Sequence, residues 1–365
     1  MATTYSKLVK QRMKNTCLSH NSNFLLCLCI VFLGLLIIQG PVYSQQDKPF
    51  QIWLGELRQE AESRGYSQAS IELAFSEIRE PVQRIVNNDR NQAEVVQSYA
   101  DYLSARVSDW KQTNGKRLMI EHQGLLEGIA SEYRVQARFI VAIWGMETNF
   151  GTYPITEPVF TTLATLAYDR RRADFYRAQF FAALTILDSG FPPYEKMKSS
   201  WAGAMGQSQF IPESYLRFAV DYDGDGKRDI WDSQADALAS IANYLKSSGW
   251  NDDQTWGRKV RLPTGSQDIL RVNQSVGTNP DQNCVQYESL GVWRDLQVWQ
   301  KLGIRREDGS DLPARSIPAA LLLADPEDSE GFIVYSNFCT IMRFNPAIKY
   351  ALSIGLLSDL IAQQP

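Results

Sequence analysis

The sequence predicts a mainly α-helical protein with a small β portion, an α+β fold, and three observations support this class. Apolar residues recur at helical spacing through residues 45–255. From residue 256 the pattern changes to short β-prone runs separated by Pro, Gly, Asn and Asp. A last segment with helical spacing, Ala347 to Ile361, closes the chain. Because 365 residues are long for one compact domain, we expect one large domain with subdomains.

Residues 1–44 have the features of a secretory signal peptide. They contain four basic residues and no acidic one, followed by an apolar run from Phe24 to Ile38. This run falls short of the roughly 20 residues that span a bilayer, so a signal peptide is favoured over a membrane anchor. Val42-Tyr-Ser44 offers small or tolerated residues before a cleavage site after Ser44. We therefore expect an exported protein, with a retained membrane anchor as the alternative.

Charge and histidine content exclude several classes of function. Loss of residues 1–44 lowers the formal net charge from −4 to −8, and an acidic protein is a poor candidate for nucleic-acid binding. Only two histidines exist; His20 lies in the leader, and His122 lies in a helical pattern from Gly115 to Tyr133 without a nucleophile motif. Histidine-dependent hydrolysis and His-rich zinc sites are therefore not expected. The chemistry should use carboxylates, amides and hydroxyls, and no organic cofactor is expected.

Two helical parts are expected between the leader and residue 255. The first part, residues 45–135, is rich in charged residues, and the second, residues 136–255, contains longer apolar runs. The clearest helical segments are Phe50–Arg58, Tyr102–Trp110, Tyr176–Leu187 and Ala235–Leu245.

Glu147 is the most informative residue of the second part, because it is a carboxylate in the apolar run Phe139–Gly151. Ile143 and Trp144 precede Glu147 by four and three residues, so all three share one face of a helix. Since burial of an ionised carboxylate is costly, its pKa should rise toward neutrality. A carboxylic acid that is protonated near pH 7 suits general-acid catalysis. The structural alternative is a helix-terminal Glu that reaches water or pairs with an arginine.

Residues 221–232 match a calcium-binding loop, with Gly226 at the position of the tight turn. The expected oxygen donors are Asp221, Asp223, Asp225, the carbonyl of Lys227, and Asp229. The last position holds Asp232 instead of the usual bidentate Glu, and Asp236 could replace it. An all-oxygen donor set favours a structural calcium ion that joins the helices at Tyr215 and Ala235. A solvated Asp-Gly turn is the alternative.

The β portion is expected at residues 256–340, before a C-terminal helix in residues 341–365 that returns to the helical core. The β-prone runs are Val260–Leu262, Ile269–Val272 and Phe332–Ser336. Outside the leader only Cys284 and Cys339 remain. An even pair in an oxidising compartment predicts a disulfide, with two buried thiols as the alternative.

Three segments together resemble the B-type lytic murein transglycosylases (glycoside hydrolase family 103). They are Trp144–Gly151, Ser200–Tyr215, and the calcium loop that leads into Ala242–Leu245. Glu-Thr-x-Phe-Gly alone would be a weak motif, but the following Gly-Ala-Met-Gly-x-x-Gln-Phe-x-Pro makes the combination specific. The resemblance covers most of residues 50–362 and implies a lysozyme-like fold with α, β and core parts and an EF-hand-like loop.

The resemblance implies a mechanism with one carboxyl group. A glycoside hydrolase normally needs two carboxylates, and no motif places a second one beside Glu147. Lytic transglycosylases use a single acid, which here implies that Glu147 protonates the glycosidic oxygen between MurNAc and GlcNAc. The resulting carboxylate would then take the proton of the MurNAc C6 hydroxyl. That hydroxyl attacks C1 and yields a 1,6-anhydro product, with the advantage of an intramolecular reaction.

The resemblance also implies roles for residues around Glu147. Ser200 and Gln209 match positions that border the catalytic Glu, although a helix cap is an alternative for Ser200. Arg171 and Arg172 match an arginine pair that contacts peptidoglycan, whereas without the resemblance they would be a solvated face. Further substrate-binding positions are implied at Phe210, Phe175, Tyr244, Phe344, Asn345, Tyr350 and Tyr102. Core packing is the alternative for the aromatic residues, and Phe175 and Phe344 lack a hydroxyl where tyrosine can occur.

In the metal loop the resemblance favours Asp236 over Asp232 as the distal ligand. The partner implied is the peptidoglycan glycan strand, and the location is the periplasm, with association with the membrane left open. A monomer is expected, and participation in complexes of cell-wall enzymes is left open. Two alternatives remain: a hydrolytic muramidase, and a non-catalytic, calcium-stabilised scaffold that binds peptidoglycan. The pairing of Glu147 with Gln209 in the motifs argues against the scaffold.

Overall fold

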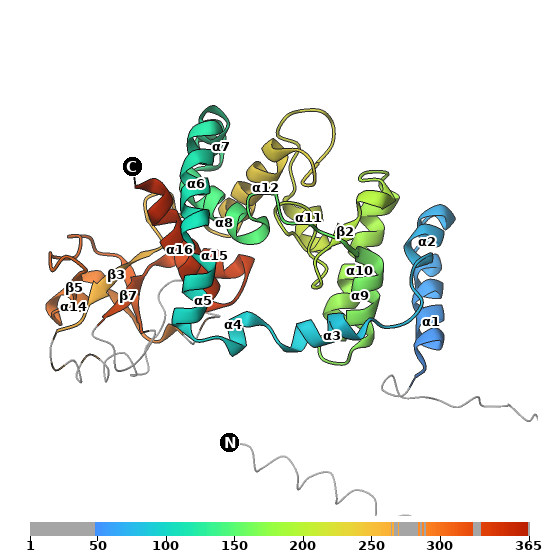
Figure 1. The fold of residues 1–365 in the computed structure, drawn as a ribbon, viewed down its shortest axis with the longest axis horizontal. Coiled ribbons are helices and arrows are strands. Elements are labelled where there is room, and N and C mark those ends of the chain that lie inside the picture. The colour runs from blue at the N-terminus through green and yellow to red at the C-terminus, as the bar shows by residue number, and fades with distance from the viewer. Residues whose placement is uncertain are drawn as a thin grey trace, which may run out of the picture. The chain divides into compact units, whose positions relative to one another are not determined.

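The structure is a computed structural model that describes residues 48–263, 265, 269, 284, 287, 290–323 and 330–363. The predicted signal peptide, residues 1–44, lies outside the described residues. Within the described part of the chain, no helix has both the length and the apolar character needed to cross a membrane. The fold is mainly helical with two small sheets, which confirms the predicted class (Figure 1).

Helices make up the N-terminal part. They are α1 (Phe50–Ser63), α2 (Gln68–Phe75), α3 (Gln83–Arg90), α4 (Ala93–Val96), α5 (Tyr99–Arg106), α6 (Asp109–Glu121) and α7 (Gln123–Tyr133). The expected helix Tyr102–Trp110 is wrong as one element, because the Ser108 side chain accepts a hydrogen bond from the Lys111 amide and starts α6. The pattern from Gly115 to Tyr133 is likewise divided at His122, whose φ of −104° and ψ of 21° leave the helical range.

The second part contains five further α-helices among the described residues and a two-stranded sheet. Its elements are α8 (Ala137–Thr148), β1 (Glu157–Pro158), α9 (Val159–Tyr168), α10 (Ala173–Asp188), the 3-10 helix η1 (Tyr194–Lys196), β2 (Lys198–Ser199), α11 (Pro212–Phe218) and α12 (Gln234–Ser247). β1 pairs antiparallel with β2, with Glu157 opposite Ser199. This pairing ties the segment that follows α8 to the loop that begins at Ser200.

The third part is an antiparallel five-stranded sheet followed by two C-terminal helices. Its elements are β3 (Gly257–Arg261), β4 (Trp293–Asp295), α14 (Leu296–Lys301), β5 (Arg305–Arg306), β6 (Pro318–Leu322), β7 (Glu330–Val334), α15 (Ser336–Phe344) and α16 (Ile348–Ala362). The strand order is β4-β6-β7-β3-β5, and Gly257 of β3 lies opposite Val334 of β7. The strands predicted at Val260 and Phe332 are confirmed.

The strand predicted at Ile269 is wrong at that residue, which is helical, and the rest of that run lies outside the described residues. Ile269 packs in a buried cluster with Val260 and Trp299, so burial without strand pairing explains the apolar side chain. Cys284 and Cys339 form a disulfide, as predicted, with their Cα atoms 5.3 Å apart. The bond attaches Cys284 to α15.

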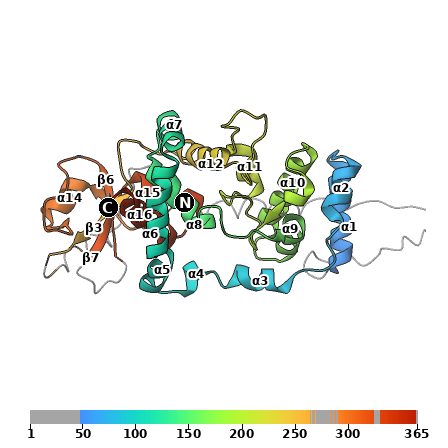
Figure 2. The ribbon, with the colours of Figure 1, turned by 45° about the horizontal axis from the view of Figure 1, so that its top comes forward.

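Two helical cores meet near the end of α8. In the first core α16 packs against α8, α6, α5 and α15, as Figure 1 shows. In the second core α9 and α10 pack against each other and against α2, while α1 and α3 pack against α9 (Figure 2). Trp144 belongs to the first core and Phe210 to the second, and Phe344 packs against both. Glu147, in the last turn of α8, therefore lies close to the boundary between them.

Candidate active site

α8 presents Glu147 in its last turn and ends directly afterwards. Asn149 and Phe150 have positive φ values of 49° and 61°, and Gly151 follows with 78°. Left-handed backbone costs about 1–3 kcal/mol for each non-glycine residue and is concentrated at functional sites. The buried Phe150 ring packs over Gly145, where a Cβ would lie 2.4 Å from Phe150 Cε1. This packing stabilises the sharp turn that ends α8 directly after Glu147.

Glu147 has one direct side-chain partner in the described part of the chain. The buried Tyr350, on α16, donates a hydrogen bond from its hydroxyl to Glu147 Oε1 at 2.5 Å. Burial raises the pKa of Glu147 from 4.5 to about 7, although the Tyr350 bond and the charge of Lys111 act in the opposite direction. Burial likewise raises the pKa of Tyr350, so its hydroxyl stays protonated. The carboxyl is thus poised to give and to take a proton near neutral pH.

Lys111 is a buried cation close to Glu147, with 7% of its surface exposed. Its Nζ lies 4.0 Å from Met146 Sδ, next to Glu147 in the sequence. Burial lowers the pKa of Lys111 to about 8; the charge of Arg106 lowers it further, and the charge of Glu147 raises it. A protonated Lys111 therefore stabilises the carboxylate form of Glu147 without a direct hydrogen bond between them among the described contacts.

We predict that Glu147→Gln stabilises the folded protein at alkaline pH. Ionisation of Glu147 in the folded protein lowers the free energy of unfolding, because the folded pKa of about 7 lies above the unfolded value of 4.5. This loss of stability is absent below pH 4.5 and fully present above pH 7. A glutamine avoids this cost and can still accept the Tyr350 hydrogen bond. The gain should be about 1–3 kcal/mol at pH 8, reduced by the partial exposure of Glu147, and close to zero at pH 4. Urea unfolding of both proteins at the two pH values measures it, and an equal difference at both would contradict the raised pKa.

The loop Ser200–Phe210 covers the end of α8 and is held by a glutamine that the sequence motifs did not single out. Gln207 accepts a hydrogen bond from Trp144 Nε1 at 3.0 Å and donates one to the Trp231 carbonyl at 3.0 Å. The Thr148 hydroxyl donates to the Gln207 carbonyl at 3.0 Å. Gln207 therefore fixes the loop to α8 through Trp144, which precedes Glu147 in the sequence, and through Thr148, which follows it.

Ser200 and Gln209, both expected beside Glu147, take part in the turns of this loop. The Ser200 hydroxyl accepts a hydrogen bond from the Ala204 amide at 3.4 Å. Gln209 has a positive φ of 49°, and its amide donates to the carbonyls of Ala204 and Gly206 at 3.3 and 3.1 Å. Strained backbone at a non-glycine residue is consistent with a functional position.

An aromatic cluster lies behind the loop. The Phe210 ring is 1% exposed, and its centroid lies 5.7 Å from that of Tyr244 and 5.8 Å from that of Phe344. The Tyr244 hydroxyl donates to the Arg343 carbonyl at 2.5 Å. Phe210 therefore packs in the core, while the partly exposed Tyr244 and Phe344 connect this packing to the surface.

Tyr102 and Asn345 lie on elements that surround α16. Tyr102 is 1% exposed, and its hydroxyl donates to Glu94 at 3.0 Å. Glu94 raises the pKa of Glu147, which places a second carboxylate within electrostatic reach of the first. Asn345 accepts a hydrogen bond from the Ala347 amide at 3.2 Å and so helps to start α16.

Comparison with known proteins identifies the family of this chain. The family described as Transglycosylase SLT domain matches residues 49–359. The chain belongs to this family. SltB3 from Pseudomonas aeruginosa, solved in complex with NAG-anhNAM-pentapeptide, is 39% identical, with a TM-score of 0.76 over 86% of this chain and 79% of that chain. The expected lysozyme-like fold is thereby confirmed.

Two further similar proteins come from Escherichia coli. Membrane-bound lytic murein transglycosylase B is 28% identical over 262 residues, which are 68% of this chain and 63% of that protein. The match thus spans less than two thirds of the relative's length. Lytic transglycosylase Slt35 in complex with calcium is 22% identical, with a TM-score of 0.68 over 87% of this chain and 93% of that chain, and shares the fold.

Arg171 and Arg172 bind Asp89 of α3 in this SLT-domain chain. Arg171 Nε donates to Asp89 Oδ2 at 2.9 Å, and Arg172 pairs with the other oxygen. Burial alone would raise the pKa of Asp89, but the bonds to the two arginines outweigh it and lower that pKa. The arginines keep 46% and 39% of their side chains exposed, beside the exposed Phe175 ring. They join α3 to α10 and still present charge at the surface.

The acidic loop brings three carboxylates together. Oxygens of Asp221, Asp223 and Asp236 lie within 4.8 Å of one another. Asp225 is outside this group and accepts a hydrogen bond from the Lys227 amide at 2.8 Å. The side chain of Asp232 pairs with Lys196, so Asp236 is better placed as the distal ligand.

Asp236 is fully buried, and its two oxygens accept hydrogen bonds from the amides of Tyr222, Asp223 and Asp229. Burial raises the pKa of Asp236, the three amides lower it, and the charge of Asp223 raises it again. A buried carboxylate beside two others is a donor set that fits a hard cation.

Lys111, Glu94 and Gln207 are the residues around Glu147 that sequence motifs missed. Lys111, Gly115 and Leu118 form the buried residues of α6 at helical spacing. A lysine on the same helical face as the buried Gly115 and Leu118 is the one sequence signal that indicates a buried cation. Glu94 and Gln207 carry no comparable pattern, because their positions depend on the packing of distant elements.

Proposed function

We propose that this chain is a lytic transglycosylase that cleaves the β-1,4 bond between MurNAc and GlcNAc in peptidoglycan without consuming water. The observation that carries the proposal is the Glu147 carboxyl, whose pKa is about 7 and which Tyr350 holds in the last turn of α8. Membership of the SLT-domain family supports the reaction class. The relative SltB3 was solved with a disaccharide peptide that contains an anhydro sugar, which supports the product.

In the first step the protonated Glu147 carboxyl donates its proton to the glycosidic oxygen, and the bond from MurNAc C1 to that oxygen breaks. The GlcNAc chain leaves with a free hydroxyl, and positive charge develops at C1. Glu147 is now a carboxylate, which the Tyr350 hydroxyl and the charge of Lys111 stabilise. These two groups offset part of the cost of forming a charge in a buried setting.

In the second step the same carboxylate removes the proton from the MurNAc C6 hydroxyl. The C6 oxygen forms the new bond to C1, which gives the 1,6-anhydro sugar and restores the protonated Glu147. The proton count balances, and no second carboxylate is required. A pKa near 7 suits a group that acts as both acid and base, since neither direction of proton transfer is strongly uphill.

We assign the remaining candidates to the substrate groove around Glu147. Ser200 and Gln209 would border the Glu147 carboxyl, because both belong to the loop that Gln207 fixes to α8. Tyr102 of α5 would lie behind Tyr350, whose pKa it raises. Arg171, Arg172 and Phe175 would contact the strand at a more distant subsite, through the surface that they keep exposed. The remaining surface of the groove is formed by Tyr244, Phe344 and Asn345, with the buried Phe210 packed behind them. We also propose that the chain after the leader has four parts, at residues 45–135, 136–255, 256–340 and 341–365.

We further propose that Asp221, Asp223 and Asp236 hold a structural calcium ion, with Asp225 and the carbonyl of Lys227 completing its ligands. The oxygen donors and the burial of Asp236 support calcium. The ion would fix the loop between α11 and α12, and it has no part in the proton transfers. We place the enzyme in the periplasm after export by the predicted signal peptide, because its substrate lies there.

Incubation with purified sacculi tests the proposed function. We expect the protein to release soluble fragments, and a Glu147→Gln variant to bind sacculi without release. A non-catalytic scaffold would give equal binding and no release with either protein, which would contradict the proposal.

A further inference from the structure

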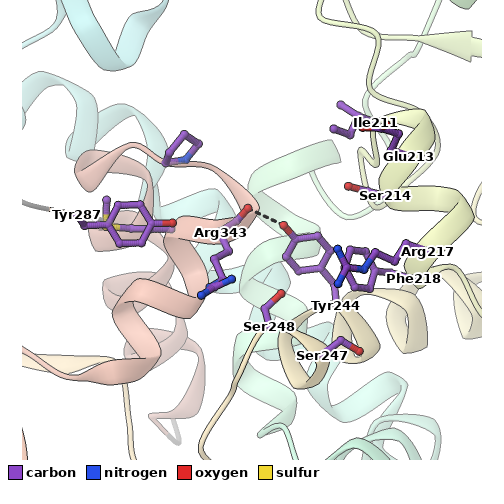
Figure 3. Close-up of a pocket in the computed structure, with 12 residues that line it drawn as sticks. Ile211, Glu213, Ser214, Arg217, Phe218, Tyr244, Ser247, Ser248, Tyr287 and Arg343 are labelled. Atoms are coloured by element: carbon purple, nitrogen blue, oxygen red, sulfur yellow. Dashed lines mark hydrogen bonds between the residues drawn. The ribbon is translucent and has the colours of Figure 1, made fainter. Parts of the chain in front are cut away.

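A pocket of about 540 Å³ opens between α11, α12 and α15, with Tyr287 at one side (Figure 3). Its polar lining includes Ser214, Arg217, Tyr244, Ser247, Tyr287 and Arg343. A volume of this size is within the range of roughly 300–1,000 Å³ that is typical of ligand pockets. The pocket is separate from the direct partners of Glu147.

Two arginines at this pocket keep their guanidinium groups available. Arg217 and Arg343 are both exposed, and neither forms an ion pair within the ranges that the structure describes. Arg217 lies over the Phe218 ring, with its Cζ 5.0 Å from the ring centroid, which restricts its position. The acidic residue at the pocket edge, Glu213, accepts a hydrogen bond from Gln179 of α10 at 2.5 Å.

Several other arginines at the surface of the protein are paired with carboxylates. Arg64, for example, pairs with Glu60, and Arg171 pairs with Asp89. In an acidic protein, two unpaired guanidinium groups at one pocket indicate an anionic ligand.

Tyr244 connects the pocket to the catalytic carboxyl. In Figure 3 its ring lies between the side chains of Arg217 and Arg343, and its hydroxyl donates to the Arg343 carbonyl. Tyr244 is also close enough to Tyr350 to raise the pKa of that hydroxyl, and Tyr350 donates to Glu147. Tyr244 and Tyr350 thus link the pocket lining to the carboxyl that would act on the sugar.

We propose that this pocket binds a carboxylate of the stem peptide attached to MurNAc, so that the enzyme distinguishes peptide-bearing strands from bare glycan. The inference rests on the proposed function, since it takes the substrate to be peptidoglycan. The peptide is linked through the lactyl group of MurNAc and carries free carboxylates, whereas the sugars themselves are uncharged. Guanidinium groups bind carboxylates through paired, charge-assisted hydrogen bonds, and the hydroxyls of Ser214 and Ser247 can serve the peptide amides.

Isothermal titration in the Glu147→Gln background tests the pocket without turnover. The two probes are GlcNAc-MurNAc-pentapeptide and the same disaccharide without its peptide. We expect the added pair Arg217→Gln and Arg343→Gln to weaken binding of the first probe about tenfold, or about 1.4 kcal/mol, and binding of the second less than twofold. Arg64→Gln, an exposed arginine of the N-terminal helices, is the matched control and should change neither.

Equal weakening with both probes, or no weakening with either, would overturn the inference. Melting temperatures of all variants show whether the substitutions disturb the fold, and both pocket arginines are exposed enough that we expect little change. Activity of the otherwise unaltered enzyme on peptide-free strands tests the proposed function separately. If the two substitutions do not selectively weaken binding of the peptide-bearing probe, while the enzyme still cleaves peptide-free strands, the pocket alone is rejected.

Discussion

Glu147→Gln is expected to reduce turnover of peptidoglycan by at least about a thousandfold, while the variant still binds glycan. Glutamine keeps the shape of the side chain and can accept the Tyr350 hydrogen bond, but it cannot donate a proton to the leaving oxygen. General acid–base catalysis contributes about 10²–10⁴-fold, and here one group performs both transfers. Initial rates of fragment release from sacculi, with a pull-down to measure binding, check the result.

Glu94→Gln is the matched control for this substitution. Glu94 is the second carboxylate that acts electrostatically on Glu147, and it already accepts the Tyr102 hydroxyl. If Glu147 alone is the acid and base, Glu94→Gln should lower the rate less than tenfold. A loss as large as that of Glu147→Gln would indicate a mechanism with two carboxylates. Retention of more than a few per cent of activity by Glu147→Gln would exclude Glu147 as the acid.

Removal of calcium is expected to lower the melting temperature by about 10 °C. A ligand that binds only the folded state at 1,000 times its dissociation constant stabilises it by about 4 kcal/mol. In a chain of this size each kcal/mol corresponds to about 2–4 °C. The effect should exceed any loss of activity in the protein that remains folded, because the ion takes no part in catalysis. Thermal unfolding with added calcium, added magnesium, or EDTA measures it.

Two aspartates of the loop provide the control. Asp223 is exposed and belongs to the carboxylate group, whereas Asp232 lies outside it and pairs with Lys196. Asp223→Asn should abolish the response to calcium and yet be at least as stable as the unaltered protein in EDTA, because it removes repulsion on Asp236. Asp232→Asn should keep the response. A melting temperature that does not change with EDTA would exclude the calcium site.

The sequence predicts the chemistry of Glu147 because that chemistry is local. An apolar helix around one carboxylate is sufficient to predict a raised pKa, and the structure gives a pKa of about 7. The disulfide was equally accessible, since only Cys284 and Cys339 remain outside the leader. The helical class followed from spacing alone, without knowledge of how the helices pack.

Longer-range features could not be predicted in the same way. Lys111 approaches Glu147 only because α6 packs against α8, and the charge of Glu94 acts on Glu147 from the separate helix α4. The division of helices at Ser108 and His122 was missed, although a serine at a helix start is a readable signal. At Ile269 the β-branched side chain favours a strand, but the structure has a helical residue there. Its apolar character predicts the burial of the side chain and not the type of element.

The mass of the released fragments tests the central claim most directly. Digestion of purified sacculi by the unaltered enzyme should give MurNAc ends that are one water lighter than the products of hydrolysis. When the digestion is run in water labelled with heavy oxygen, no label should enter those ends, since the C6 hydroxyl replaces water at C1. Products with the mass of hydrolysed ends, or with label at C1, would contradict the account of Glu147 as acid and then base.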